Sequence, residues 1–116
     1  MITKGIRGAI TVEENTSESI KEATSELLEE LIKQNQIKKE FISHAIFTLT
    51  NDLDAVFPAK IARESFGWDD VAMLCFHELN VPGSLPMCLR ILIVLNCEEG
   101  FSPNFVYLKD AEKLRK

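Results

Sequence analysis

Hydrophobic residues recur at three- and four-residue spacing between positions 20 and 32, and charged side chains fill most of the positions between them. Either Asn15 or Thr16 can cap such a helix, and Glu18 lies three residues after Asn15, as a capping box requires. The pattern predicts an amphipathic helix that ends near Asn35 and has an acidic, solvated outer face. Its apolar stripe consists of Ile20, Ala23, Leu27, Leu28, Leu31 and Ile32.

Other segments show the alternating or continuous apolar pattern that is typical of strands. Pro58 and Gly67 delimit a short helix, because proline suits the first turn of a helix and glycine suits its end. Residues 102–103 are expected to start a helical turn, and the charged tail 110–116 is expected to be mobile unless it is tied down. The predicted strands cover residues 2–12, 41–50, 71–79, 88–96 and 105–108.

The order of these elements predicts an α/β (α+β) fold, with a mixed sheet of about five strands and the long and short helices on one face. The crossover through the long helix implies a parallel pair of strands, and the VPGS loop after the third strand is of hairpin size. A chain of 116 residues fits one domain, residues 1–116. No further helix is left for the second face of the sheet, so we expect self-association through that face.

Composition and charge narrow the classes of function. A net charge of −5 without a basic stripe argues against nucleic acid as a partner. No segment has the length and apolar character of a membrane span, and the N-terminus lacks the features of a signal peptide, so we expect no membrane partner and a cytoplasmic protein. The three cysteines form no C-x-x-C pair and the two histidines lie far apart, so we expect neither disulfides nor a metal site.

Arg90 is the residue that the hydrophobic pattern explains least, because it directly precedes the apolar run 91–95 within a predicted strand. A guanidinium keeps its charge at ordinary pH, so its burial is costly unless anions or hydrogen-bond acceptors surround it. Arg90 either extends to solvent near a strand end, or pairs with a carboxylate such as Glu78, or forms an anion site that faces a pocket. The local sequence leaves these interpretations open.

Several other polar residues are lodged in or near apolar elements and widen this set. Each also has a purely structural interpretation: a tyrosine can be a core residue, and cations on a short helix can be surface charges. The set is rich in cations and contains no catalytic histidine, phosphate loop or nucleophile–base pair, so it suits a small polyanion whose reaction needs no proton transfer. Its further members are Arg7, Cys75 and Tyr107 in strands, and Phe57, Lys60 and Arg63 around the short helix.

Long motifs make the chain similar to a known family. GIRGAITVEENT, DLDAVFPAKIARESFGW, the cysteine and glutamate of LCFHELNVPGSLPMCLRILI, and the terminal VYL…LR resemble the AroH-class chorismate mutases, in order and through nearly the whole chain. These are small homotrimeric enzymes with a pseudo-α/β-barrel fold, and they convert chorismate to prephenate by a pericyclic [3,3] rearrangement. The resemblance implies an isomerase with chorismate as its small-molecule partner, no cofactor, no metal, and active sites between the subunits of a homotrimer.

The same resemblance assigns roles to the polar residues. Arg90 is implied to stabilise the ether oxygen, where negative charge grows as the C–O bond breaks. Glu78 is implied to bond the ring hydroxyl, together with the thiol or backbone of Cys75. Arg7 and Tyr107 are implied to hold the carboxylate of the substrate's side chain.

The remaining implied site residues are grouped around the short helix and at the C-terminus. Phe57 is implied to pack on the substrate, and Lys60, Arg63 and Arg115 to supply positive charge near the mouth of the site. In the family, the residues of the short helix come from the neighbouring subunit. The resemblance therefore agrees with the uncovered sheet face expected above.

Two features depart from a simple match. Leu74 stands where close relatives are expected to carry a polar threonine, so one polar contact is expected to be absent or made by the backbone. Cys75 and Glu78 are three residues apart and would face opposite ways on a regular strand. If both touch the substrate, the strand must end or bulge near residues 76–77.

Two other classes of protein are alternatives. The trimeric imine/enamine deaminases share the chain length and bind small carboxylates between subunits, but FPAKIARES does not resemble their sequences. A non-catalytic carboxylate-binding module would keep the arginines but would have no use for Glu78. The sequence therefore favours the mutase over both.

Overall fold

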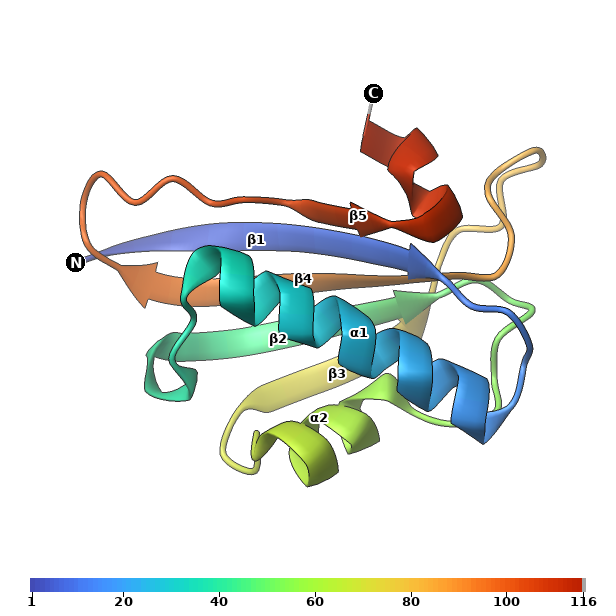
Figure 1. Ribbon diagram of the computed structural model, residues 1–116, viewed down its shortest axis with the longest axis horizontal. Helices are drawn as coiled ribbons and strands as arrows, with labels where there is room; N and C mark the ends of the chain where they lie inside the picture. The colour runs from blue at the N-terminus through green and yellow to red at the C-terminus, as the bar shows by residue number, and fades with distance from the viewer. Residues whose placement is uncertain (116) are drawn as a thin grey trace.

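The computed structural model describes residues 1–115, and of Arg115 the backbone alone. These residues form a five-stranded mixed sheet with two α-helices on one of its faces (Figure 1), so the predicted α+β fold is confirmed. The strands are β1 (Ile2–Thr11), β2 (Ile42–Leu49), β3 (Ala72–His77), β4 (Cys88–Cys97) and β5 (Val106–Leu108). The helices are α1 (Ser17–Asn35), α2 (Pro58–Phe66), and the short 3₁₀-helices η1 (Lys39–Phe41) and η2 (Lys109–Arg115).

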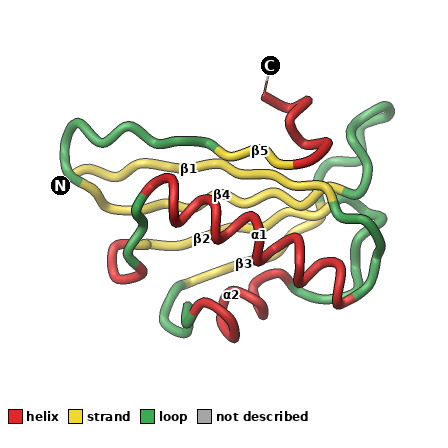
Figure 2. The backbone as a smooth tube through the Cα atoms, in the orientation of Figure 1, coloured by secondary structure: helices red, strands yellow, loops and turns green. Residues whose placement is uncertain are grey.

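The strand order β3-β2-β4-β1-β5 corrects two of the expected connections. β1 and β2 run in the same direction, but they do not pair with each other, because β4 lies between them and is antiparallel to both. β3 pairs with β2 in parallel, with α2 as the connection. The expected hairpin between β3 and β4 is therefore wrong, and residues 78–87 form a long loop past β2 (Figure 2). The continuous apolar run of β4 favours a central position with a neighbour on each side.

The helix ends follow local signals in the sequence. Thr16 is the N-cap of α1, where its Oγ1 accepts the backbone N–H of the third helical residue at 3.1 Å. The helix ends as predicted, and Gln36 adopts the left-handed conformation that often follows a helix, with φ of 52°. α2 begins at Pro58 and stops at Gly67, whose φ is 70°. Asn15, the other possible cap, forms different contacts, described below.

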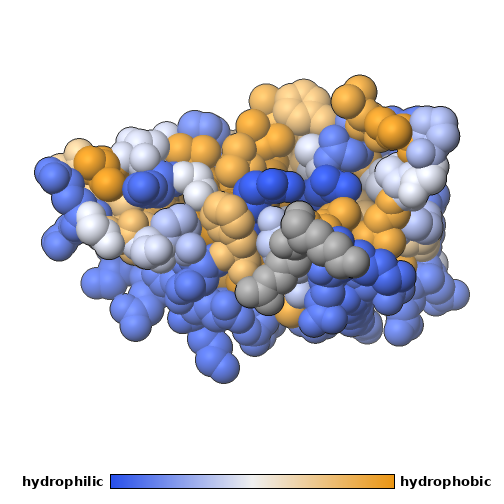
Figure 3. All heavy atoms as spheres, turned by 90° about the horizontal axis from the view of Figure 1, so that it is seen from above, coloured by the Kyte–Doolittle hydropathy of each residue, from blue (hydrophilic) through white to orange (hydrophobic). Residues whose placement is uncertain are grey.

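The main core lies between α1, α2 and one face of the sheet. Alternate residues of each strand point into it, and the rest point to the opposite face, which we call the open face. Figure 3 shows hydrophilic residues along the helix side of the molecule and hydrophobic residues gathered on the opposite side. The expected uncovered apolar face is therefore present in the chain, and it carries Ile46, Leu74, Phe76, Leu92 and Val94, of which Leu74 and Phe76 are exposed.

The C-terminal region differs from the expectation in two ways. Residues 102–103 form no helical turn, and the side chain of Asn35 bonds both the N–H (2.7 Å) and the carbonyl (2.9 Å) of Asn104, which fixes this segment to the C-terminal end of α1. The tail is tied down as far as η2, where Ala111 is buried against Ala9 and Cys88 on the open face.

None of the described helices combines the length and the apolar character needed to cross a membrane.

The close packing of α1 on β1 gives a test of the core. A Cβ added at Gly8 would lie 2.8 Å from Leu31 Cδ1 and 3.1 Å from Leu27 Cδ1, and both leucines are buried and cannot easily move. We expect Gly8→Ala to lower the free energy of unfolding by about 1–3 kcal/mol through overpacking, measured by urea denaturation at fixed protein concentration. Gly5→Ala is the control, because its Cβ would meet Leu92 Cδ1 at 3.3 Å on the open face. Equal losses in both variants would contradict the packing explanation.

Candidate active site

A row of side chains crosses the open face from β5 to β3. The register pairs Tyr107 with Ala9, Ala9 with Arg90, Arg90 with Thr48, and Thr48 with Phe76. Partner residues on neighbouring strands share a face of the sheet, so all five side chains project from the open face. The sheet thus brings the predicted site residues Arg90 and Tyr107 into one line, with a single strand between them.

Arg90 lies at the centre of this row, and it pairs with Glu78, which is one of the interpretations that the sequence left open. Its side chain is 26% exposed, and its Nε lies 3.7 Å from Oε2 of Glu78. This distance makes an ion pair but is too long for a hydrogen bond. Nε of Arg90 is a buried donor without a hydrogen-bond partner in the described part of the chain. Arg90 therefore has a carboxylate as its counter-charge, and its guanidinium is still partly exposed to an anion on the open face.

Glu78 reaches the open face because it follows Leu74 and Phe76 at the two-residue spacing of a strand. β3 itself ends at His77, one residue earlier. The backbone N–H of Glu78 donates to the carbonyl of Leu49 at 2.8 Å, and its carboxylate Oε2 accepts from Thr48 Oγ1 at 3.0 Å. Cys75, inside the strand, faces the helices instead. The strand ends two residues before the expected position 79, and Cys75 and Glu78 still face opposite sides, as the spacing of three on a regular strand predicted.

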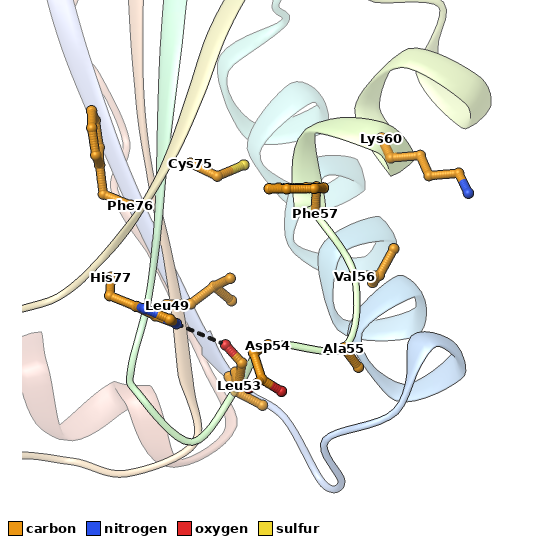
Figure 4. A pocket seen from close by; sticks show the side chains of 10 residues that line it. All are labelled: Leu49, Leu53, Asp54, Ala55, Val56, Phe57, Lys60, Cys75, Phe76 and His77. Carbon is orange, nitrogen blue, oxygen red and sulfur yellow. Dashed lines mark hydrogen bonds between the residues drawn. The ribbon is translucent and has the colours of Figure 1, made fainter.

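A second group of predicted residues lines an open groove at the β3 edge of the sheet, on the helix side. The groove has a volume of about 520 Å³ and includes Cys75, Phe57 and Lys60 in its lining. Figure 4 shows the Cys75 thiol pointing toward the ring of Phe57, while Phe76 projects from the other side of β3. A groove of this size fits a small organic ligand.

The Cys75 thiol is suited to hydrogen bonding and not to nucleophilic attack. Burial raises the pKa of Cys75, and the backbone hydrogen bond with Ala59 and the positive charge of Arg63 only partly oppose this rise. Because the thiolate is the reactive form, a raised pKa leaves the group neutral near pH 7. Burial likewise raises the pKa of Cys88, and the nearby Arg90 guanidinium opposes the rise.

Within residues 1–115, no cluster of histidine, cysteine, aspartate or glutamate is arranged to hold a metal ion.

The structure thus separates the predicted site residues into two groups, with β3 between them. Leu74 lies on the open face and is 60% exposed, so its apolar side chain provides no polar contact there. The side chain of Arg115 lies outside the described part of the chain. The open-face group is Arg7, Glu78, Arg90 and Tyr107, and the groove group is Phe57, Lys60, Arg63 and Cys75.

The loop that carries Phe57 is anchored by a residue whose role sequence reasoning missed. Asn15 Oδ1 accepts the N–H groups of Asp54 (2.9 Å) and Ala55 (3.1 Å), and its Nδ2 donates to Asp54 Oδ1 at 2.8 Å. The position of Asn15 before a helix pointed to capping, and nothing local indicates a partner 39 residues away. Thr48 was also missed, because a threonine in a strand needs no explanation until the fold places Glu78 beside it.

Comparison with known proteins gives consistent results. The family model described as chorismate mutase type I matches residues 3–116. A chorismate mutase AroH of Bacillus subtilis (strain 168) is 42% identical over 98 residues, which is 84% of this chain and 77% of that protein. The chorismate mutase AroH of Thermus thermophilus is 44% identical over 116 residues, which is 98% of this chain and 94% of that protein. A solved structure of a chorismate mutase from Clostridium thermocellum superposes with a TM-score of 0.90 at 40% identity and covers 95% of this chain and 98% of its own.

The anchoring role of Asn15 can be measured without any substrate. Asn15→Ala removes three hydrogen bonds to the loop but leaves the Thr16 cap in place, so we expect several-fold faster amide hydrogen exchange at Asp54 and Ala55. Gln34→Ala is the control, because it removes a 3.0 Å side-chain bond at the opposite end of α1. Unchanged exchange in the Asn15 variant would show that the loop does not depend on this side chain.

Proposed function

This chain belongs to the chorismate mutase type I family and is an isomerase, and we propose that it rearranges chorismate to prephenate in a site built from two neighbouring copies. The observation that carries the proposal is Arg90, a partly buried guanidinium on the open face that lies beside the Glu78 carboxylate without bonding to it. The [3,3] rearrangement needs no proton transfer and no covalent intermediate. A cation-rich set of residues is therefore sufficient for the chemistry.

Arg90 is proposed to act on the charge that develops during the rearrangement. The enolpyruvyl side chain must lie over the ring in a chair-like conformer before the new C–C bond can form. Because the C–O bond breaks first, negative charge grows on the ether oxygen, and a fixed cation there stabilises the transition state more than the ground state. The position of Arg90 in a central strand supports this role, since both neighbouring strands hold its backbone in place.

The other residues of the open face are proposed to orient the substrate. Glu78 accepts a hydrogen bond from the ring hydroxyl, and Arg7 and Tyr107 bind the carboxylate of the enolpyruvyl side chain. Tyr107 lies in the row that contains Arg90, and Arg7 lies in the next row, where its register partner on β4 is Leu92. This shared face supports simultaneous contact with one small ligand.

The groove group is proposed to come from a second copy in a homotrimer. β3 separates this group from Arg90 within one chain, and Phe57 exposes 67% of its surface at the groove. Exposed Leu74 and Phe76 on the edge strand provide an apolar surface for association. The neighbour's Phe57 then packs on the substrate, its Cys75 and the backbone at Leu74 contact the ring hydroxyl, and its Lys60 and Arg63 attract the dianion.

The net charge of −5 does not oppose the binding of a dianion, because a pocket lined by cations focuses its own local field. In the cell, the reaction is proposed to be a committed step toward phenylalanine and tyrosine in the cytoplasm. The deaminase alternative is disfavoured, because the matching family model and the relatives named above are chorismate mutases.

Removal of the guanidinium tests the proposed chemistry. We expect Arg90→Ala to fold but to lose on the order of 3–4 kcal/mol of transition-state stabilisation, the amount typical of one fixed oxyanion donor. Arg90→Lys should recover little, because a flexible ammonium does not reproduce the planar fork. The assay follows the loss of chorismate ultraviolet absorbance without added metal or cofactor and confirms prephenate as the product. Near-normal turnover in either variant would contradict the role of Arg90.

Subunit complementation tests the shared site. One chain carries Arg90→Ala, and the other carries Lys60→Ala with Arg63→Ala; each alone should be weakly active. After co-refolding in equal amounts, about three quarters of the trimers contain both kinds of chain. Each mixed trimer has one complete site out of three, so about a quarter of the wild-type activity should return. Activity no higher than the mean of the two parents would place the whole site within one chain. Co-refolded wild type provides the reference.

A further inference from the structure

Thr48 lies where the two charged groups of the open face meet. It is the next-to-last residue of β2, with Arg90 as its register partner on β4 and Phe76 as its partner on β3. Its Oγ1 donates to Glu78 Oε2 at 3.0 Å, and the same carboxylate oxygen lies 3.7 Å from Arg90 Nε. A hydroxyl and a guanidinium therefore face the same carboxylate oxygen, and the hydroxyl is the closer of the two.

The alternative arrangement would be a closed ion pair. A carboxylate beside a guanidinium in a half-buried site favours direct charge-assisted bonds, with N···O distances of about 2.7–2.9 Å. Such a pair would satisfy the Arg90 Nε donor, which is unsatisfied in this structure. It would also turn Glu78 toward the arginine and away from a ligand. The observed 3.7 Å separation thus leaves both groups available.

We propose that Thr48 is a positioning residue, whose hydroxyl holds the Glu78 carboxylate away from Arg90 and so keeps the guanidinium free for the substrate. This inference rests on the function proposed above, in which Arg90 and Glu78 contact different parts of chorismate. In this role Thr48 does not contact the reacting atoms of the substrate. It acts by fixing the positions of Glu78 and Arg90 relative to each other.

The backbone around Thr48 suits this task. β2 is an inner strand, paired on one side with β3 and on the other with β4, so its side chains project from a rigid base. Threonine is branched at Cβ and has few rotamers, which limits the directions that its hydroxyl can take. The next residue, Leu49, accepts the backbone N–H of Glu78 at 2.8 Å. Two consecutive residues of β2 therefore hold Glu78, one by its main chain and one by its carboxylate.

The first test compares two substitutions at the same position. Thr48→Val keeps the shape but removes the hydroxyl, so we expect a folded protein with roughly a tenfold lower kcat/KM, from the loss of one hydrogen bond to a charged group. KM should rise as well, because Arg90 must leave its new partner before it binds substrate. Thr48→Ser retains the hydroxyl and should stay within about threefold of wild type. Wild-type kcat and KM in Thr48→Val would overturn the proposal.

A matched control separates positioning from simple stabilisation. Thr3→Val removes a hydrogen bond of the same length, 3.0 Å from Thr3 Oγ1 to Asn96 Oδ1, at the far end of the same sheet. It should leave kcat and KM unchanged. The Thr48→Val change is then repeated in a Glu78→Ala background, where no carboxylate is left to hold. There it should cause no further loss, whereas additive losses would indicate a structural role and overturn the proposal.

A crystal structure of Thr48→Val tests the inference independently of the reaction. The Arg90 Nε to Glu78 Oε2 distance should shorten from 3.7 Å to hydrogen-bond length. An unchanged distance would overturn the positioning role even if activity fell. Absence of chorismate turnover in the wild type would instead defeat the proposed function, and the crystallographic result would still decide what Thr48 does to the pair.

Discussion

The proposed site depends on a permanent positive charge in the central strand of an apolar sheet. β4 lies between β1 and β2, and its alternate residues Leu89, Ile91, Ile93 and Leu95 are buried in the core. Arg90 belongs to the other face, where it cannot lose its charge and where its Nε has no hydrogen-bond partner in the described part of the chain. Such a donor lowers stability when it is left unsatisfied, so its presence is best explained by a ligand that satisfies it.

Much of the surrounding structure serves to hold this charge and its carboxylate in place. Met87 N–H donates to Asp52 Oδ2 at 3.0 Å, and Cys88 N–H donates to Thr50 Oγ1 at 3.0 Å, so the loop after β2 holds the start of β4. Met87 adopts a left-handed conformation, with φ of 51°, just before the strand begins. Glu78 follows Phe76 at two-residue spacing and so faces the open side, where the carbonyl of Leu49 holds its backbone N–H. Strand ends and side-chain caps, more than the core, therefore set the geometry of the site.

In the proposed function, the division of the site residues between two faces links catalysis to association. A single chain exposes an aromatic ring at Phe57 and an apolar edge strand at Leu74 and Phe76. These surfaces are unfavourable in water and favour burial against another copy. Contact with a neighbour would also remove water from around Arg90, which strengthens its interaction with a developing negative charge. The same contact can thus stabilise the assembly and create the active site.

Local patterns in the chain were sufficient for the helices, for all five strand positions to within two residues, and for the odd position of Arg90 in an apolar run. They succeed because capping, apolar periodicity and the effects of proline and glycine act over one or two helical turns. The family resemblance added the other site residues, but it could not place them on particular faces. The order of strands, the contact of Asn15 with Asp54 and the bond from Thr48 to Glu78 join residues 30 or more positions apart. These contacts depend on the order of the strands in the sheet. That order is decided by the packing of the whole sheet against α1 and α2.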